Sequence, residues 1–501
     1  MRSSGPFLVV DQGTSATKAM LFTSAGSLLD QESLPHRQIY PRAGWVEHDA
    51  EEIFNNTLKA TSTLLQRHSD QWNNLLSLSI TNQRETFVLF DSKTGQPLYN
   101  AIVWQCRRGD DICKQLIAAG NENIVHELTG LRIDTYFPAS KLLWLLNARP
   151  DFRARLKDGS ALFGTIDTYL IYRLTGGEVY ATDHTNASRT LFYDIGKLAW
   201  SQELLATFGL EFDHLPEIRE SSSWYGDTDL AGCLDRRIPI YGVMGDSQAA
   251  LFAQRCFASG SAKVTFGTGS SVLLNIGHEK RLSASGTVTA LAWVLDGQPT
   301  YAFEGIINFT GATIAWLRDQ VQLIANPTET EILAKSISDS DGVYFIPAFV
   351  GLSAPYWRAD ARAAILGITP STTRAHIVRA ALESIGFIVT DVLKSMGKDA
   401  GIVLRIIYAD GGAVRNSFLM QFVADINQIN LRASQLPELS ALGAVFNGGL
   451  GMKIYASLAD LEQIPIGFVE YAPRFDPIEA NNLFAGWQSA VQQVLYRPDQ
   501  G

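Results

Sequence analysis

The chain has 501 residues, of which 46% are hydrophobic and 18% are charged, and its net charge is −10. A chain of this length is too long for one hydrophobic core, so two large domains are expected. The composition is typical of a soluble globular protein. The negative charge argues against general binding of nucleic acid or anionic membranes, although it allows a locally positive pocket for an anionic cofactor.

The four cysteines, Cys106, Cys113, Cys233 and Cys256, lack the spacing of a metal site and fit buried thiols in a reducing compartment. The N-terminal residues run directly into a predicted strand and leave no room for the apolar stretch of a signal peptide. No apolar run approaches the length of a membrane-spanning helix. These features predict a cytoplasmic protein with no membrane partner.

Strands and helices alternate along the first half, which indicates an α/β architecture. Strands at residues 7–11 and 19–22 predict a hairpin, and residues 27–31 continue it as a meander. The next elements are a helix at 51–66, strands at 75–80 and 86–90, and helices at 110–119 and 140–147. A strand at 237–244 then ends at Gly245-Asp246 and precedes a helix at 248–256.

The second half repeats this order of elements. The sequence predicts a hairpin at 263–276, a helix at 311–320, a strand at 342–347, a long helix at 376–396, a strand at 404–409 and a helix at 416–426. Small residues at 258–261 (ASGS) form a joint at which a hinge would cost little. We therefore predict domains at residues 1–257 and 258–501.

One pattern, a strand followed by a tight turn of glycine and hydroxyl residues and a second strand, occurs once in each half. The first copy is LVVDQGTSATK at residues 8–18, and the second is KVTFGTGSS at residues 263–271. Such a turn directs backbone N–H groups and hydroxyls to one point, which suits a phosphate. Two copies predict two similar halves that close on one nucleotide.

Two aspartates follow predicted strands and are candidates for chemistry. Asp11 could hold Mg²⁺, directly or through water, beside the phosphates, or it could cap the hairpin turn. Asp246 lies at the strand edge where ligands of α/β sheets gather, and it could accept the proton of a hydroxyl that attacks phosphorus. The alternative for Asp246 is capping of the following helix.

A second group of residues suits a polyol. Arg84 and Glu85 end an apolar strand and could bind vicinal hydroxyls, or they could form a structural ion pair. Trp104 and Tyr136 could lie against the carbon face of a polyol, or they could belong to the core. Gly311 and Gly412 stand where a flat base could approach the backbone, although helix-entry glycines look alike.

In combination these segments resemble the FGGY carbohydrate kinases of the actin-like ATPase superfamily, and among them most strongly the glycerol kinases. The resemblance covers essentially the whole chain and includes both family signatures, YFPASKLLW at residues 136–144 and a second that runs from residue 363 to residue 383. It implies two RNase H-like domains with MgATP and substrate in the cleft between them. The implied reaction is phosphorylation of a terminal hydroxyl of a small polyol, with glycerol as the expected substrate.

The resemblance also implies roles for individual residues. Asp246 would be the general base, and Asp11 and Asp246 would hold Mg²⁺. The polyol site would be formed by Arg84, Glu85, Trp104, Tyr136, Asp246, Ser247 and Ser271. The nucleotide would contact Gln12, Thr14, Ser15, Lys18, Thr268, Gly311, Gly412, Ala413 and Asn416. Family members further suggest a homo-oligomer, either a dimer or a tetramer.

The sequence departs from the glycerol kinase pattern at three places. Ser247 replaces a glutamine and Ser271 replaces an aromatic residue of the substrate pocket, which predicts a larger and more polar pocket. A kinase for a longer polyol or sugar is therefore an alternative. Residues 232–237 (GCLDRR) lack most glycines of a loop that binds fructose 1,6-bisphosphate in some bacterial relatives, so loss of that inhibition is predicted.

A last alternative is a non-catalytic actin-like ATPase scaffold. It would combine an intact nucleotide site with a decayed polyol site. The expected polyol and catalytic residues Arg84, Glu85, Trp104, Tyr136 and Asp246 are all present, and this favours an enzyme.

Overall fold

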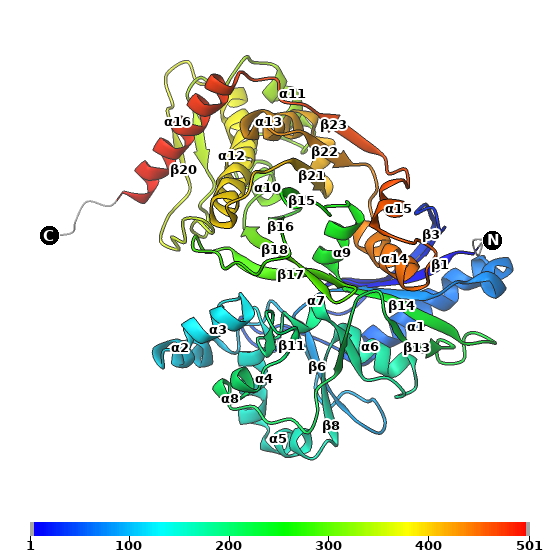
Figure 1. Cartoon of the computed structure of the whole chain (residues 1–501). Coiled ribbons are helices and arrows are strands. Elements are labelled where there is room, and N and C mark those ends of the chain that lie inside the picture. The colour runs from blue at the N-terminus through cyan, green and yellow to red at the C-terminus, as the bar shows by residue number, and fades with distance from the viewer. Residues whose placement is uncertain (1–4, 497–501) are drawn as a thin grey trace.

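Two large β-sheets organise the computed structural model, which describes residues 5–496 (Figure 1). The first sheet belongs to the N-terminal half. Its strands, in spatial order, are β13 (Trp224–Thr228), β14 (Ile238–Gly245), β5 (Leu78–Asn82), β1 (Phe7–Gln12), β2 (Ala16–Phe22) and β3 (Leu28–Pro35). Strands β1, β2 and β3 form an antiparallel meander, whereas β5 and β14 run parallel to β1.

The second sheet belongs to the C-terminal half. Its strands, in spatial order, are β17 (Val288–Leu295), β18 (Gln298–Ile307), β16 (Ser270–Gly277), β15 (Ser261–Phe266), β21 (Ile406–Asp410), β22 (Leu431–Ser434) and β23 (Phe468–Tyr471). Strands β16 and β18 are antiparallel to their neighbours, whereas β21 and β22 continue from β15 in parallel. Both sheets thus place a hairpin beside two parallel strands, and the predicted two-domain α/β fold is confirmed.

Two helices fill the space between the sheets, as Figure 1 shows: α9 (Asp246–Ala253) and α14 (Leu439–Gly451). Helix α14 lies between β22 and β23 of the second sheet in sequence but packs on β14, β5 and β1 of the first sheet and on α9. One apolar cluster includes Phe7 and Met20 of the first sheet, Phe252 of α9, Phe446 of α14 and Leu273 of the second sheet. The two halves therefore share a buried core.

The N-terminal half carries an additional layer that supplies part of the cleft wall. Its strands are β4 (Glu47–His48), β7 (Ala101–Ile102), β6 (Phe87–Asp91) and β8 (Ala161–Thr165). The helices of this half are α1 (Ala50–Arg67), α2 (Asp110–Ala118), α3 (Glu122–Thr129), α4 (Pro138–Ala148), α5 (Pro150–Lys157), α6 (Ile166–Leu174), α7 (His184–Ala187) and α8 (Gln202–Thr207). Helix α1 begins where the Asp49 carboxylate accepts hydrogen bonds from the N–H groups of Glu51 and Glu52.

The second sheet is covered by a long central helix and its neighbours. The helices of this half are α10 (Gly311–Asp319), α11 (Glu329–Lys335), α12 (Arg374–Ala400), α13 (Ser417–Asn427), α15 (Leu458–Glu462) and α16 (Pro477–Leu495). A short hairpin of β19 (Tyr344–Ile346) and β20 (Ala364–Leu366) packs near α12 and α16. Among residues 5–496, no helix combines the length and the apolar character needed to span a lipid bilayer.

The structure differs from the sequence predictions at the ends of several elements and in two additional strands. The helix expected at 248–256 begins two residues earlier, at Asp246, and the strand expected at 75–80 is β5 at Leu78–Asn82. The predicted 263–276 hairpin is present, but β17 and β18 extend its sheet on the far side of β16. These two strands were not predicted, and they matter because β18 lines the cleft described next.

Candidate active site

The first predicted phosphate-binding turn joins β1 to β2. A hydrogen bond of 2.9 Å from the N–H of Gly13 to the carbonyl of Ala16 closes it. Thr14 lies on the wall of an interdomain cleft, and its hydroxyl accepts a 3.0 Å hydrogen bond from Nε1 of Trp104. Ser15 is exposed at the tip of the turn. Thr14 thus lines the cleft and Ser15 is exposed, and a phosphate contact stays a prediction for both.

Two other residues of this turn already have partners. The side chain of Gln12 is buried and accepts a 2.9 Å hydrogen bond from Nε2 of Gln83, so it supports the turn from behind. The ammonium of Lys18 lies 2.8 Å from the carboxylate of Glu438, the residue that precedes α14. This ion pair joins the first turn to the helix between the sheets, so a phosphate would have to share Lys18 with Glu438.

The second turn joins β15 to β16 and is held by α10. The N–H of Gly267 donates to the carbonyl of Gly269, and the N–H groups of Gly311 and Ala312 donate to the carbonyls of Gly267 and Thr268 at 3.0 and 2.9 Å. A side chain at position 311 would lie 2.6 Å from the Gly267 carbonyl oxygen, so only glycine fits there. Thr268 itself is exposed beside the start of α10.

A pocket of about 650 Å³ opens on the α10 side of the second turn. It brings together five of the residues predicted to bind the nucleotide: Thr268, Gly311, Gly412, Ala413 and Asn416. Ile314, Leu382, Ile385 and Leu419 supply an apolar wall, and Arg318, Arg415, Thr330 and Glu331 supply polar groups. A mostly apolar pocket with a few polar groups beside a phosphate-type turn suits a nucleoside.

Asn416 lines this pocket, but its side chain also holds the local structure. Its Oδ1 caps α13 by accepting a 3.0 Å hydrogen bond from the N–H of Leu419, and its Nδ2 donates to the Thr330 hydroxyl at 3.1 Å. Asn416 therefore ties α13 to α11 across the pocket.

Asp246 is the first residue of α9, and the N-cap position is Gly245, with no side-chain capping bond. Its carboxylate accepts a 2.6 Å hydrogen bond from the N–H of Ser247 and lies 3.4 Å from Nε of Arg84. The side chain is 40% exposed and lines the interdomain cleft. Asp246 is thus accessible to a ligand, whereas the N–H of Gly245 behind it is fixed by a 2.8 Å hydrogen bond to the Thr185 hydroxyl.

Asp11 lies at the end of β1 near Asp246. Burial, followed by the negative charge of Asp246, raises the pKa of Asp11 to about 7. Two carboxylates that repel each other in this way suit a hard divalent cation, which prefers oxygen ligands. Among the described residues, no group of three or more His, Cys, Asp or Glu side chains is arranged to hold a metal, so phosphate oxygens and water would have to complete the coordination.

The predicted polyol residues come together in a cleft of about 500 Å³ between the halves. Arg84, Glu85, Trp104, Tyr136 and Asp246 all line it. The half-buried rings of Trp104 and Tyr136 are tilted against each other, with centroids 5.3 Å apart. Charged groups on one side and aromatic faces on the other can bind the hydroxyls and the carbon face of a small polyol.

Ser247 and Ser271 also line the cleft. Ser271 lies on β16 opposite Thr265 of β15 and Ile306 of β18. Its hydroxyl is buried, and no residue of the described chain offers it a hydrogen bond. A small polar side chain without a partner leaves this wall open to a hydroxyl of a ligand.

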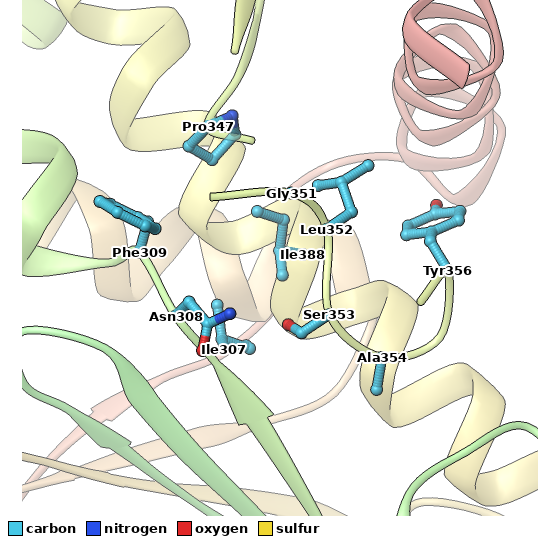
Figure 2. Close-up of a pocket in the computed structure, with 10 residues that line it drawn as sticks. All are labelled: Ile307, Asn308, Phe309, Pro347, Gly351, Leu352, Ser353, Ala354, Tyr356 and Ile388. Atoms are coloured by element: carbon cyan, nitrogen blue, oxygen red, sulfur yellow. The ribbon is translucent and has the colours of Figure 1, made fainter. Parts of the chain in front are cut away.

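A second cavity adjoins the cleft at Ile307 and Asn308, which line both (Figure 2). Leu352, Tyr356 and Ile388 are among its other lining residues, and its volume is about 20 Å³. This volume admits a single water molecule but no polyol. The cleft of about 500 Å³ is therefore the candidate polyol site.

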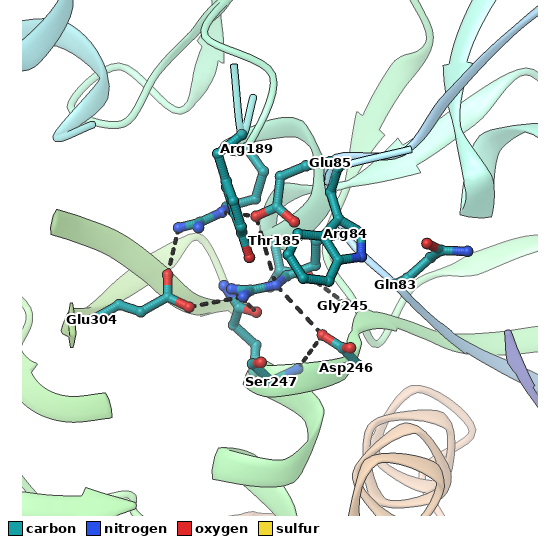
Figure 3. Close-up of polar contacts among 12 residues, drawn as sticks. Gln83, Arg84, Glu85, Thr185, Arg189, Gly245, Asp246, Ser247 and Glu304 are labelled. Carbon is teal, nitrogen blue, oxygen red and sulfur yellow. Dashed lines mark hydrogen bonds and ion pairs between the residues drawn. The ribbon is translucent and has the colours of Figure 1, made fainter. Parts of the chain in front are cut away.

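Several residues of the site were not identified from the sequence. Glu304 on β18 lines the cleft and contacts Arg84 at 2.7 Å, and Arg189 contacts both Glu304 and Glu85 (Figure 3). Glu304 gives no local signal, because its partners lie in the other half of the chain.

Comparison with known protein families matches each half of the chain to a domain model of the same family. The model of the N-terminal domain of the FGGY family of carbohydrate kinases matches residues 7–253, and the model of the C-terminal domain matches residues 262–452. Glycerol kinase 1 of Thermotoga maritima is 44% identical over 488 residues, which cover 97% of this chain and 99% of that protein. Glycerol kinase of Symbiobacterium thermophilum is 46% identical over 495 residues, which cover 98% and 99%.

Solved structures of carbohydrate kinases have the same fold as this chain. The crystal structure of Plasmodium falciparum glycerol kinase with ADP superposes with a TM-score of 0.95 at 35% identity and covers 99% of each chain. A ligand-bound xylulose kinase from Lactobacillus acidophilus shares the fold, with a TM-score of 0.88 at 23% identity over 98% of both chains. From its cleft geometry, its two matched domains and these relatives, this chain belongs to the FGGY family of carbohydrate kinases.

Proposed function

We propose that this protein is an ATP-dependent glycerol kinase, which transfers the γ-phosphoryl group of ATP to a terminal hydroxyl of glycerol. The observation that carries the proposal is the position of the second turn. Gly267 lines both the nucleotide-type pocket and the polyol cleft, with Thr268 on the first side and Gly269 on the second. A phosphoryl group held by this turn would lie between the two substrates.

The reaction divides among residues of this chain. Arg84 donates hydrogen bonds to the glycerol hydroxyls, Glu85 accepts from them, and Trp104 and Tyr136 enclose the carbon face. The Asp246 carboxylate accepts the proton of the terminal hydroxyl of glycerol, while the oxygen of that hydroxyl forms a bond to the γ-phosphorus. The bond from that phosphorus to the bridging oxygen breaks, and ADP leaves. Closure of the halves keeps water from competing with glycerol.

Asp11 and Asp246 are proposed to hold Mg²⁺ beside the phosphates, partly through water. The cation would neutralise charge on the phosphate oxygens during transfer. Thr14, Ser15 and Lys18 of the first turn, and Thr268 of the second, are proposed to bind the phosphate chain. The pocket between α10 and α13, with Gly311, Gly412, Ala413 and Asn416, would take the nucleoside.

A coupled assay of ADP release tests the proposal. The purified protein with MgATP is offered glycerol, erythritol, threitol, ribitol, xylitol, dihydroxyacetone and xylulose, and kcat/KM is compared. We expect glycerol to give the highest value, with glycerol 3-phosphate as the product. No stimulation by any polyol or sugar above basal hydrolysis would contradict the proposal.

A kinase for a four- or five-carbon polyol is the second candidate. The unpartnered buried hydroxyl of Ser271 supports it, since a longer polyol carries an additional hydroxyl that this group could bind. The same substrate panel separates the two candidates, because a preference for erythritol or a pentitol over glycerol would favour the second.

We also propose a cytoplasmic location, which is supported by the four cysteines: all lie within residues 5–496 and have free thiols. Assembly into a homo-oligomer and loss of inhibition by fructose 1,6-bisphosphate stay predictions. In the altered loop Arg237 is paired with Glu178 at 2.6 Å, which leaves it less available to an anionic effector.

A further inference from the structure

Four charged side chains form a closed ring at the wall of the polyol cleft (Figure 3). Nη2 of Arg84 lies 2.7 Å from Oε1 of Glu304, and Nη1 of Arg189 lies 2.7 Å from Oε2 of the same carboxylate. Nε of Arg189 contacts Glu85 at 2.6 Å, and Glu85 lies 3.8 Å from Nε of Arg84. Two positive and two negative groups thus alternate around the ring.

All four side chains of the ring are almost completely buried. The exposed fractions of the Arg84, Glu85, Arg189 and Glu304 side chains are 5%, 2%, 1% and 1%. Burial raises the pKa of Glu304, but the positive charges of Arg189 and Arg84 outweigh it and hold the pKa at about 2. Glu304 is therefore a fixed negative charge that both guanidinium groups face.

The members of the ring come from both halves of the chain. Arg84 and Glu85 follow β5, and Arg189 follows α7, all in the N-terminal half, whereas Glu304 is on β18 of the second sheet. Strand β18 ends at Ile307, and four residues later α10 begins at Gly311, where it holds the second turn. One short segment thus connects Glu304 to the nucleotide-type pocket.

Stability alone gives no reason for this arrangement. Burying four charges is costly, and apolar side chains of similar volume commonly stabilise a fold as well or better. The ring is instead suited to orienting the Arg84 guanidinium. The Arg84 guanidinium contacts Glu304 on one side, donates to the side-chain Oε1 of Gln248 at 3.2 Å and lies 3.4 Å from Asp246, and it still lines the cleft.

We propose that Glu304 is a positioning residue for the polyol, supplied by the C-terminal half, which orients Arg84 toward the cleft directly and Glu85 through Arg189. The polyol site is then complete only when both halves are in place. This inference rests on the proposed function and names a residue through which that function depends on domain closure.

The test compares E304Q and E304D with wild type and with E383Q. Glu383 pairs with Arg379 at 2.7 Å in the same half, with 6% and 9% of the side chains exposed, and it lies outside the cleft, so E383Q removes a similar buried charge elsewhere. Steady-state ADP release gives KM for glycerol and for ATP, and kcat. The shift of the melting temperature by MgADP reports whether each variant is folded and binds nucleotide.

We expect E304Q to raise KM for glycerol roughly 10- to 100-fold, because Arg84 loses a charged hydrogen-bond partner. Its kcat, its KM for ATP and its response to MgADP should change little, since a contact to non-reacting hydroxyls acts equally in ground and transition states. E304D keeps the charge and should recover part of the loss. E383Q should leave KM for glycerol near the wild-type value.

Two results would overturn the inference. One is a wild-type KM for glycerol in E304Q. The other is a parallel loss of the glycerol and MgADP responses in both E304Q and E304D, which would mark a purely structural role. Wild-type protein without glycerol-dependent ADP release would be a different failure, because it would contradict the proposed function itself and the inference with it.

Discussion

Three carboxylates in or near the cleft, Asp11, Asp246 and Glu304, lie in different electrostatic surroundings. Burial and the charge of Asp246 raise the pKa of Asp11 to about 7, whereas two guanidinium groups outweigh burial and hold that of Glu304 at about 2. Asp246 is 40% exposed, lines the cleft and lies 3.4 Å from Nε of Arg84. The same functional group can therefore serve as cation ligand, proton acceptor and fixed charge within one site.

We expect the residue at position 271 to set the preference for polyol length. Filling this position with S271F should lower kcat/KM for four- and five-carbon polyols relative to glycerol by roughly 10- to 200-fold, because a Phe-sized wall removes the space and the hydroxyl that a longer chain would use. S271A, which removes the hydroxyl but adds no bulk, is the matched control. Equal effects of S271F on glycerol and erythritol would show that residue 271 does not set the length of the pocket.

His48 should make stability depend on pH. It is fully buried, its Nε2 bonds to Oε1 of Gln38 at 2.9 Å, and Gln38 in turn supports the Thr14 carbonyl. Burial, followed by the charge of His36, lowers the pKa of His48 to about 3. The unfolded chain therefore binds a proton near pH 6.5 that the folded chain does not bind until about pH 3, so stability is lost as the pH falls through this window.

The measurement is the free energy of unfolding of wild type and H48Q between pH 7 and pH 4. Wild type should lose about 1 kcal/mol more than H48Q for each pH unit below about 6, because glutamine cannot titrate. Other carboxyl and imidazole groups contribute equally to both proteins and cancel in the difference. Parallel curves for the two proteins would contradict the role assigned to His48.

Among the elements, the packing of α14 on α9 fixes the helix that begins at Asp246. Gly443 of α14 meets the backbone of Ala249 so closely that a Cβ would lie 1.9 Å from its carbonyl oxygen. The position tolerates no side chain, and any displacement of α9 would move Asp246 with it.

G443A should therefore lower the free energy of unfolding by about 1–3 kcal/mol, the range for an overpacked core, and reduce kcat through displacement of Asp246. G397A in α12 is the control, since a Cβ there meets no atom closer than 3.3 Å and alanine favours a helix. Chemical denaturation of both variants measures the difference. A G443A protein as stable as wild type would show that α14 and α9 can separate without cost.

The elements that the sequence predicts well are those with local signals. The hairpin at 7–22, helix α1 and the long helix α12 follow from alternation, capping and helical spacing. The sequence predicts a later start for α9 than Asp246, because Asp246 and Ser247 also suit the turn that precedes the helix. Strands β17 and β18 were missed, since their registers depend on β16 rather than on a local pattern.

The candidate site likewise contains residues that local sequence signals predict and residues that they do not. Every residue predicted for the polyol lines one cleft. The motifs that carry these residues are local, although they belong to different sheets and to the start of α4. The partners of these residues were not predictable: Glu304 meets Arg84, and Glu438 meets Lys18, only after the two halves pack together. Long-range pairing of this kind leaves no periodicity or spacing in the sequence.

At the scale of the whole molecule, the two sheets bring two pockets to a common turn. The nucleotide-type pocket belongs to the C-terminal half, whereas the polyol cleft takes residues from both halves. Helices α9 and α14 fill the core between the sheets, and the Lys18–Glu438 pair and the charged ring at Glu304 cross between segments of both halves. Catalysis therefore depends on the relative position of the halves, as expected for transfer between two bound substrates.

The most direct test of the central claim is glycerol-dependent ADP release by wild type and D246N, with the MgADP-induced rise in melting temperature measured on both. We predict that wild type phosphorylates glycerol and that D246N loses roughly 10²- to 10⁴-fold in kcat, because the proton of the attacking hydroxyl has no acceptor. The MgADP response of D246N should be weaker than that of wild type but still measurable, because Asp11 and the nucleotide-type pocket are unchanged. Near-normal turnover of a folded D246N protein would contradict the assignment of Asp246 as the base and, with it, the proposed mechanism.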